Sequence, residues 1–93
     1  MPSRLSTRLH EAALLLLREH AADDVDVARL QAELLYADAA GWDRVRVIAA
    51  GAEAPEASTR ARFERLLERR LRHEPLAYIL GRREFYSLTF EIG

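Results

Sequence analysis

The sequence predicts an all-α fold, a small bundle of four to five helices over residues 1–81, followed by the start of a short C-terminal β-hairpin linker in residues 82–93. Two observations support this prediction. Up to residue 80, apolar residues recur at the spacings of three and four that are typical of helices, and Gly, Pro or Asp separates the runs. After Gly81 the apolar period changes to two, which places Phe90 and Ile92 on one face of a strand.

Composition limits what the chain can be. Its 93 residues suffice for one domain with a modest core. It contains no Cys, which excludes disulfides and thiolate metal sites. The longest apolar run, residues 12–17, is far shorter than a membrane span, and the N-terminus lacks the apolar core of a signal peptide. We therefore expect a cytoplasmic protein that does not enter membranes.

The first predicted helix begins near residue 5 and ends near residues 20–22. Ser3 or Ser6 is expected to cap it, because a hydroxyl can accept a hydrogen bond from a free N–H group of the first turn. Residues 14–17 are apolar around more than one face. This pattern predicts that the first helix is the central one, with neighbours on more than one side.

Two further helices follow an acidic turn at residues 23–26. The second is expected to stop at Gly41, and Asp43 is expected to cap a short third helix that reaches Ala50. Trp42 lies in the tight link between them and is expected to cover the end of the core. The residues predicted to face inward are Val27, Leu30, Leu34, Ala37, Val45 and Ile48.

The fourth predicted helix follows Pro55 and is rich in arginine. Its apolar stripe consists of Phe63, Leu66, Leu67 and Leu71. Pro75 ends this helix and begins a short fifth helix, which Gly81 closes.

Charge is distributed unevenly along the chain. Six Arg and ten acidic residues precede residue 60, whereas residues 60–84 hold eight Arg and four Glu. The candidate partner-binding residues are Arg62, Arg65, Arg69 and Arg72, which could face an acidic partner. The simpler interpretation, which we favour, is a solvated face with the pairs Arg60–Glu64 and Glu68–Arg72. His10, His20 and His73 lack metal-binding spacing, so no catalytic, cofactor-binding or metal site is predicted in the chain.

One stretch resembles a known family. The run Arg70…Glu74-Pro75-Leu76-Ala77-Tyr78-Ile79…Gly81…Arg83-Glu84-Phe85-Tyr86…Leu88…Phe90 is similar to the signature that ends the N-terminal domain of the PrmC/HemK family, the protein-(glutamine-N5) methyltransferases of peptide chain release factors. The order of the earlier helices fits this family as well. His73 and Ser87 depart from its pattern, because both positions often hold Gly in the family.

The resemblance implies a two-part enzyme. A helical substrate-recognition domain leads through a hairpin into a Rossmann-like domain that binds S-adenosylmethionine and methylates the Gln of the release factor's Gly-Gly-Gln motif. The family's Asn-Pro-Pro-Tyr motif and glycine-rich loop do not occur in these 93 residues. We therefore expect an inactive N-terminal fragment whose partners are release factors and its own catalytic domain. The expected domain-junction residues are Pro75, Tyr78, Gly81, Glu84 and Phe85.

An alternative is a stand-alone helical binding module for nucleic acid or for a second copy. The second and third helices with their turn at Gly41 could form a helix-turn-helix. The third helix is short, however, and Arg44 and Arg46 are its only basic residues, so we do not expect nucleic-acid binding. The aromatic residues Tyr78, Phe85 and Tyr86 could recognise a partner. We favour the alternative that these rings pack the hairpin against a helix.

Overall fold

A computed structural model describes residues 3–81, which form five α-helices. Their bounds are Leu5–Arg18 (α1), Val25–Ala40 (α2), Arg44–Ala49 (α3), Ala57–Leu71 (α4) and Leu76–Leu80 (α5). The all-helical bundle is thus confirmed for this part of the chain. The hairpin predicted for residues 82–93 lies outside the described residues.

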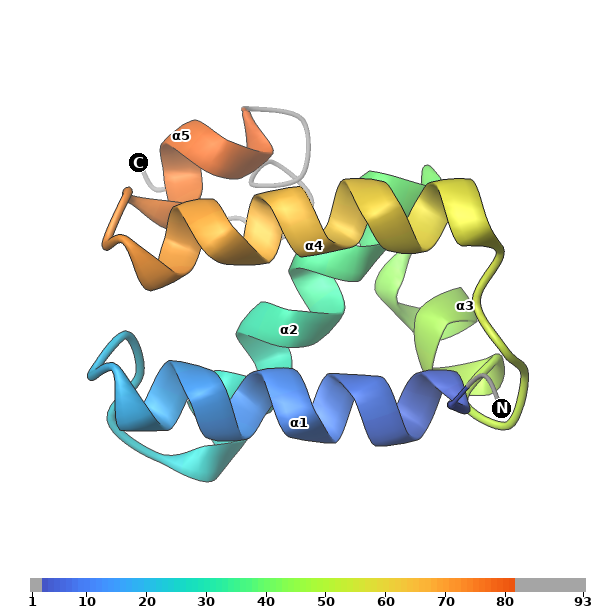
Figure 1. Ribbon diagram of the computed structural model, residues 1–93, viewed down its shortest axis with the longest axis horizontal. Helices are drawn as coiled ribbons and strands as arrows, with labels where there is room; N and C mark the ends of the chain where they lie inside the picture. The colour runs from blue at the N-terminus through green and yellow to red at the C-terminus, as the bar shows by residue number, and fades with distance from the viewer. Residues whose placement is uncertain (1–2, 82–93) are drawn as a thin grey trace.

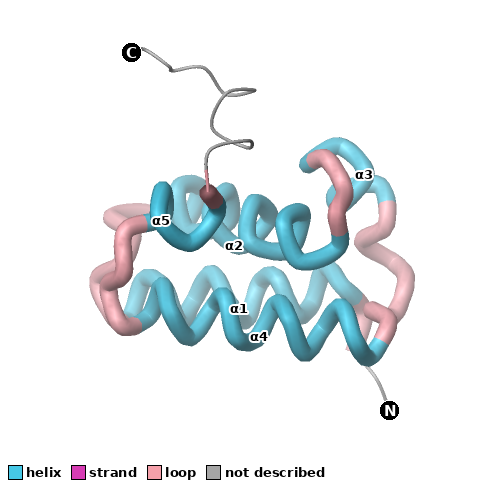
Figure 2. Tube along the Cα trace, turned by 90° about the horizontal axis from the view of Figure 1, so that it is seen from above, coloured by secondary structure: helices cyan, strands magenta, loops and turns pink. Residues whose placement is uncertain are grey.

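The helices form two layers around α2. Helices α1 and α4 run in the same direction in one layer, and α2 crosses behind them in the other layer, together with α3 and α5 (Figures 1 and 2). Helix α2 contacts all four other helices. Helix α2, and not the first helix, is therefore the central one, although α1 does have more than one neighbour, as predicted, because it contacts both α2 and α4. Leu14, within the apolar run of α1, is 48% exposed.

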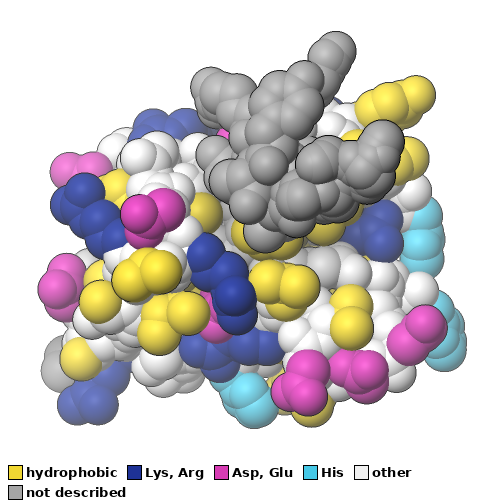
Figure 3. Space-filling view, turned by 180° about the vertical axis from the view of Figure 1, so that it is seen from behind, with side chains coloured by type: hydrophobic (Ala, Val, Ile, Leu, Met, Phe, Trp, Pro, Cys, Tyr) yellow, Lys and Arg dark blue, Asp and Glu magenta, His cyan; other side chains and the backbone are white. Residues whose placement is uncertain are grey.

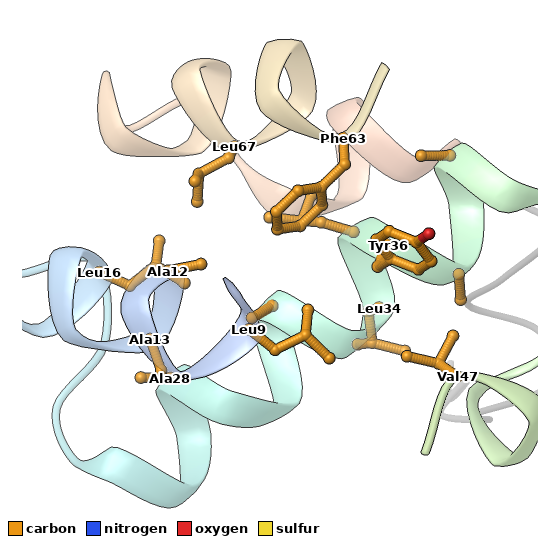
Figure 4. Close-up of a cluster of buried hydrophobic side chains, with 14 of the residues drawn as sticks. Leu9, Ala12, Ala13, Leu16, Ala28, Leu34, Tyr36, Val47, Phe63 and Leu67 are labelled. Atoms are coloured by element: carbon orange, nitrogen blue, oxygen red, sulfur yellow. The ribbon is translucent and has the colours of Figure 1, made fainter. Parts of the chain in front are cut away.

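The core between the two layers is built from small side chains at one end and from aromatic rings at the other. Ala28 and Ala32 of α2 are fully buried, which lets neighbouring helices approach closely. Further along α2, the ring of Tyr36 lies 5.5 Å from that of Phe63 on α4, centroid to centroid, and 6.0 Å from that of Trp42. Figure 4 shows the rings of Tyr36 and Phe63 near Leu9 of α1 and Leu67 of α4. Phe63 and Leu67 are buried, which confirms the apolar stripe of α4.

Several helix ends carry caps at residues that the sequence marks out. The carboxylate of Asp24 accepts a hydrogen bond from the Val27 N–H at 2.9 Å, and that of Asp43 accepts one from the Arg46 N–H at 2.8 Å. Gly41 ends α2 with a φ of 72°, in the left-handed region where a residue with a β-carbon is strained.

The start of α1 differs from the prediction. No side chain caps it, so the expected role of Ser3 or Ser6 was wrong. The Leu5 N–H donates instead to the Glu53 carbonyl at 2.8 Å, and the Ser6 N–H donates to the Gly51 carbonyl at 2.9 Å. The loop before α4 therefore provides acceptors that a reading of local sequence cannot detect.

The rotation of α3 was also predicted incorrectly. Val45 is 75% exposed and Ile48 is 53% exposed, whereas Val47 between them is fully buried. Helix α3 has only six residues, which is less than two turns, so few of its side chains can face the core. Val47 is the one that does. Val27, which was expected to face inward on α2, is likewise exposed.

Helices α1 and α4 end in the same backbone motif, and a histidine occupies its left-handed position. His20 has a φ of 60° and His73 has a φ of 68°. After α4, the His73 N–H donates to the Arg70 carbonyl at 2.8 Å and the Glu74 N–H donates to the Arg69 carbonyl at 3.1 Å. This is a Schellman motif, in which Gly is the residue of lowest strain.

Candidate partner-binding site

The four candidate arginines form a stripe along α4, because their spacings of three and four bring them to one side of the helix. We call Arg62, Arg65, Arg69 and Arg72 the arginine stripe. Nε of Arg62 donates to the Ala39 carbonyl at 2.9 Å, near the C-terminus of α2. Nε of Arg69 donates to Glu74 at 2.9 Å. Two of the four guanidinium groups therefore hold the fold together as well as facing outward.

The other two members of the stripe are more available to a partner. Arg65 is exposed and has no ion-pair or hydrogen-bond partner within residues 3–81. Arg72 lies 3.6 Å from Glu68, and both side chains are about two-thirds exposed. Exposed pairs of this kind contribute about 0–1 kcal/mol, so they exchange partners at little cost.

The predicted pairs Arg60–Glu64 and Glu68–Arg72 are both present, each at 3.6 Å. Ion pairing at Glu64, on the side of α4 away from the arginine stripe, is stronger than the sequence suggests. Arg8 of α1 makes the closer contact with Glu64, through Nε at 2.7 Å and Nη2 at 2.6 Å. This two-pronged hydrogen bond lowers the pKa of Glu64 below its ordinary value and fastens α1 to α4.

A shallow hollow lies beside the arginine stripe. It has a volume of about 380 Å³ and is lined by Asp38, Ala39, Arg62, Arg65, Leu66 and Arg69. Three of its six lining residues are arginines. A surface of this composition is suited to a carboxylate, which guanidinium groups bind in a planar, two-pronged geometry.

The predicted domain-junction residues divide into two groups. Pro75 is the N-cap of α5, and Gly81 ends α5 with a φ of 74°. Tyr78 is 75% exposed, and its predicted packing with the hairpin stays a prediction, because the hairpin lies outside the described residues. Glu84, Phe85 and the neighbouring Tyr86 lie outside the described residues.

The link between α4 and α5 is braced by ionic contacts. The carboxylate of Glu74 accepts two hydrogen bonds from Arg69, and these bonds lower its pKa.

Arg70 belongs to the stretch that resembles the family, but the sequence predicted no role for it. Its guanidinium donates to Oε1 of Gln31 at 3.0 Å, to the Ala21 carbonyl at 2.9 Å and to the Glu74 carbonyl at 2.9 Å. Arg70 thus ties α4 to α2, to the loop after α1 and to the start of α5. The partners lie up to 49 positions away in sequence, so no local pattern reveals them.

Helix α3 gives little support to the helix-turn-helix alternative. Nε of Arg44 donates to Glu33 at 2.8 Å, and the guanidinium of Arg46 lies 4.3 Å from the centre of the Trp42 ring. Both basic side chains of this helix are therefore engaged within the fold. The face of the molecule over α3 gathers hydrophobic side chains (Figure 3), of which Val45 and Ile48 are the most exposed.

The fold and the site together define a small helical domain with a cationic stripe along α4. Within residues 3–81 no group of His, Asp or Glu is arranged to hold a metal ion. None of the described helices is long and apolar enough to cross a membrane.

Comparison with known proteins places this domain in a family. The family described as "PrmC N-terminal domain" matches residues 8–81, and the chain belongs to it. The chain is 43% identical over 63 residues, 68% of its length, to a release factor glutamine methyltransferase of Burkholderia pseudomallei. A release factor glutamine methyltransferase of Neisseria gonorrhoeae is 39% identical over 65 residues, 70% of the chain. The resemblance drawn from residues 70–90 is thereby confirmed.

A shorter segment is similar to a different kind of relative. A bifunctional methyltransferase of Rickettsia felis is 71% identical over 31 residues, which are 33% of this chain and 6% of that protein. The chain covers 22% of the Burkholderia relative and 24% of the Neisseria relative, so it spans less than a quarter of either. No solved structure matches the chain significantly.

Proposed function

We propose that the chain is the release-factor-recognition domain of a methyltransferase that uses S-adenosylmethionine and modifies the Gln of the Gly-Gly-Gln motif in peptide chain release factors. The match of the PrmC N-terminal domain family over residues 8–81 is the observation that carries this proposal. The names of the relatives support the substrate. A protein that acts on release factors would work in the cytoplasm.

We further propose a division of labour between two parts of the enzyme. Residues 1–81 hold the substrate, and residues 82–93 begin the linker to a Rossmann-like domain that binds the methyl donor. The 75% exposure of Tyr78, close to the end of the described residues, supports a second contact surface there. The proposed junction consists of Pro75, Tyr78, Gly81, Glu84 and Phe85.

The arginine stripe is the proposed contact with the release factor. Arg65 and Arg72 are its most available members, and the adjacent hollow is suited to acidic side chains of the substrate. Binding of the release factor at a distance from the Gln helps to orient the reacting amide. Once the substrate is held there, its encounter with the methyl donor becomes effectively unimolecular. The domain would thus supply positioning, while the methyl transfer itself takes place elsewhere in the enzyme.

The test is the kinetics of the whole methyltransferase with a purified release factor. We expect Arg65→Glu combined with Arg72→Glu to raise KM for the release factor about tenfold, which corresponds to about 1.4 kcal/mol. The values of KM for S-adenosylmethionine and of kcat should stay within twofold. Arg69 is left intact because its pairing with Glu74 braces the α4–α5 link.

Arg18→Glu is the matched control, since Arg18 is an exposed arginine on α1, outside the stripe. It should leave KM unchanged. Salt should raise KM of the wild-type enzyme more than that of the double variant, because exposed charges are screened. An unchanged KM in the double variant would show that this face of α4 does not hold the substrate.

A further inference from the structure

A second hollow lies at the other end of the molecule from the α4–α5 link. It has a volume of about 360 Å³, within the range of small-ligand sites. It lies where the start of α1, the end of α2 and the loop before α4 meet. The lining residues that matter for its chemistry are Tyr36, Trp42, Glu53, Pro55, Glu56 and Arg62.

The hydroxyl of Tyr36 belongs to this hollow and has no hydrogen-bond partner within residues 3–81. Tyr36 is only 2% exposed, and its ring is held between Phe63 and Trp42. Figure 4 shows its oxygen at the end of the ring that points away from Leu9 and Phe63. The ring is buried while the hydroxyl opens into the hollow, where its oxygen is available to bond a ligand.

The hollow is negative around this hydroxyl. Burial raises the pKa of Tyr36, and the carboxylates of Glu56 and Glu53 raise it further. The oxygen of the neutral phenol can accept a hydrogen bond. Arg62 is the cationic residue of the lining, and its Nε is already bonded to the Ala39 carbonyl. The walls formed by Trp42 and Pro55 are apolar. Such a combination suits a positively charged group on an apolar stem.

We propose that this hollow binds an arginine or lysine side chain of a protein partner. The cation would donate hydrogen bonds to the Tyr36 hydroxyl and to the carboxylates of Glu53 and Glu56, while its methylene stem packs against Trp42. That the partner is a protein rests on the proposed function. The hollow and the arginine stripe then form two contacts of opposite charge, which would fix the direction in which a substrate lies along α4.

The experiment uses the 93-residue chain and Nα-acetyl-arginine methylamide as probe. Trp42 is the only tryptophan, so its fluorescence and its indole N–H resonance both report on the hollow. We expect a saturable change with a Kd on the order of a millimolar for a single side chain. The neutral isostere Nα-acetyl-citrulline methylamide should produce no saturable change.

Variants separate the site from non-specific attraction. Glu53→Gln combined with Glu56→Gln should weaken probe binding at least tenfold, and Tyr36→Phe should weaken it about threefold or more. Tyr36→Phe removes an unpartnered hydroxyl, so its melting temperature should be equal to or above that of the wild type. The controls Glu19→Gln and Tyr78→Phe, both at exposed positions, should bind the probe as the wild type does.

Equal binding of the citrulline probe, full affinity in Tyr36→Phe, or the absence of any saturable change would each overturn the proposal. No release factor takes part in the measurement. The result therefore does not depend on the experiment with Arg65 and Arg72, and either proposal can fail while the other stands.

Discussion

The three hydrogen bonds of Arg70 lead to a strong prediction about stability. Replacement by Met keeps most of the side-chain length and removes every donor. The Ala21 carbonyl keeps a partner, because Nε2 of Gln31 also donates to it at 3.1 Å. The Glu74 carbonyl belongs to a partly exposed residue and can bind water. Oε1 of Gln31, a residue only 9% exposed, is the group left without a partner.

These contacts set the expected magnitude. A hydrogen bond to a charged donor contributes about 1.5–3 kcal/mol, and an unsatisfied buried acceptor costs about 1–3 kcal/mol, but the two are not additive. We expect Arg70→Met to lower the free energy of unfolding by about 2–4 kcal/mol. For a domain of this size the melting temperature should fall by roughly 10–20 °C.

The assay is urea unfolding followed by circular dichroism at the helix band, with thermal melts alongside. Arg72→Met is the matched control, because Arg72 is exposed and its pair with Glu68 is long; it should cost less than about 0.5 kcal/mol. Gln31→Leu in the Arg70→Met background should recover part of the loss, since it removes the orphaned acceptor. Equal stability of Arg70→Met and Arg72→Met would refute the reasoning.

Three further predictions concern backbone strain and pH. His73→Gly should raise the free energy of unfolding by up to about 1 kcal/mol in the same urea assay, because the left-handed conformation at this position strains a residue with a β-carbon; a loss of stability would contradict the assigned motif. Gly41→Ala should lower the free energy of unfolding by about 1 kcal/mol, because it places a β-carbon in the left-handed conformation. No atom lies within 4 Å of the added β-carbon, so a much larger loss would show that backbone strain is not the cause. Arg8 lowers the pKa of Glu64 from its ordinary 4.5, so the pair stabilises the fold above that pH and the benefit is lost as pH falls through the lowered pKa. Glu64→Gln should therefore destabilise the protein at pH 7 in urea melts, and its difference from the wild type should shrink as pH falls through the lowered pKa of Glu64. A pH-independent difference would exclude the ionic contribution.

Local sequence signals predicted much of the fold. The acidic residues before α2 and α3, the glycine after α2 and the stripe of Phe63 and Leu67 each act within one or two turns of the chain, so their effects can be read without coordinates. The structure places His73 in the left-handed position of the motif that ends α4. Backbone sterics favour glycine at such a position, which is a local effect.

What the sequence could not predict depends on contacts between distant residues. Helix α2 is central because of Ala28 and Ala32, and alanine fits a core or a surface equally well. Gln31 is buried because Arg70, 39 positions later, reaches its side-chain oxygen. Within the arginine stripe, only the distant Ala39 carbonyl shows that Arg62 is partly structural and that Arg65 is freer. The hollow at Tyr36 is formed in part by the loop before α4, and the position of that loop cannot be predicted from the periodicity of the sequence.

The position of α2 has a consequence for how the chain folds. Helices α1, α3, α4 and α5 all rest on it, so the loss of α2 would expose the apolar face of each of them at once. Its buried amides can exchange with deuterium only when the bundle as a whole comes apart, and they should report the global free energy of unfolding. Within residues 3–81, neither half has a core that does not depend on α2, so cleavage in the loops on either side of α2 should release pieces that do not stay folded separately.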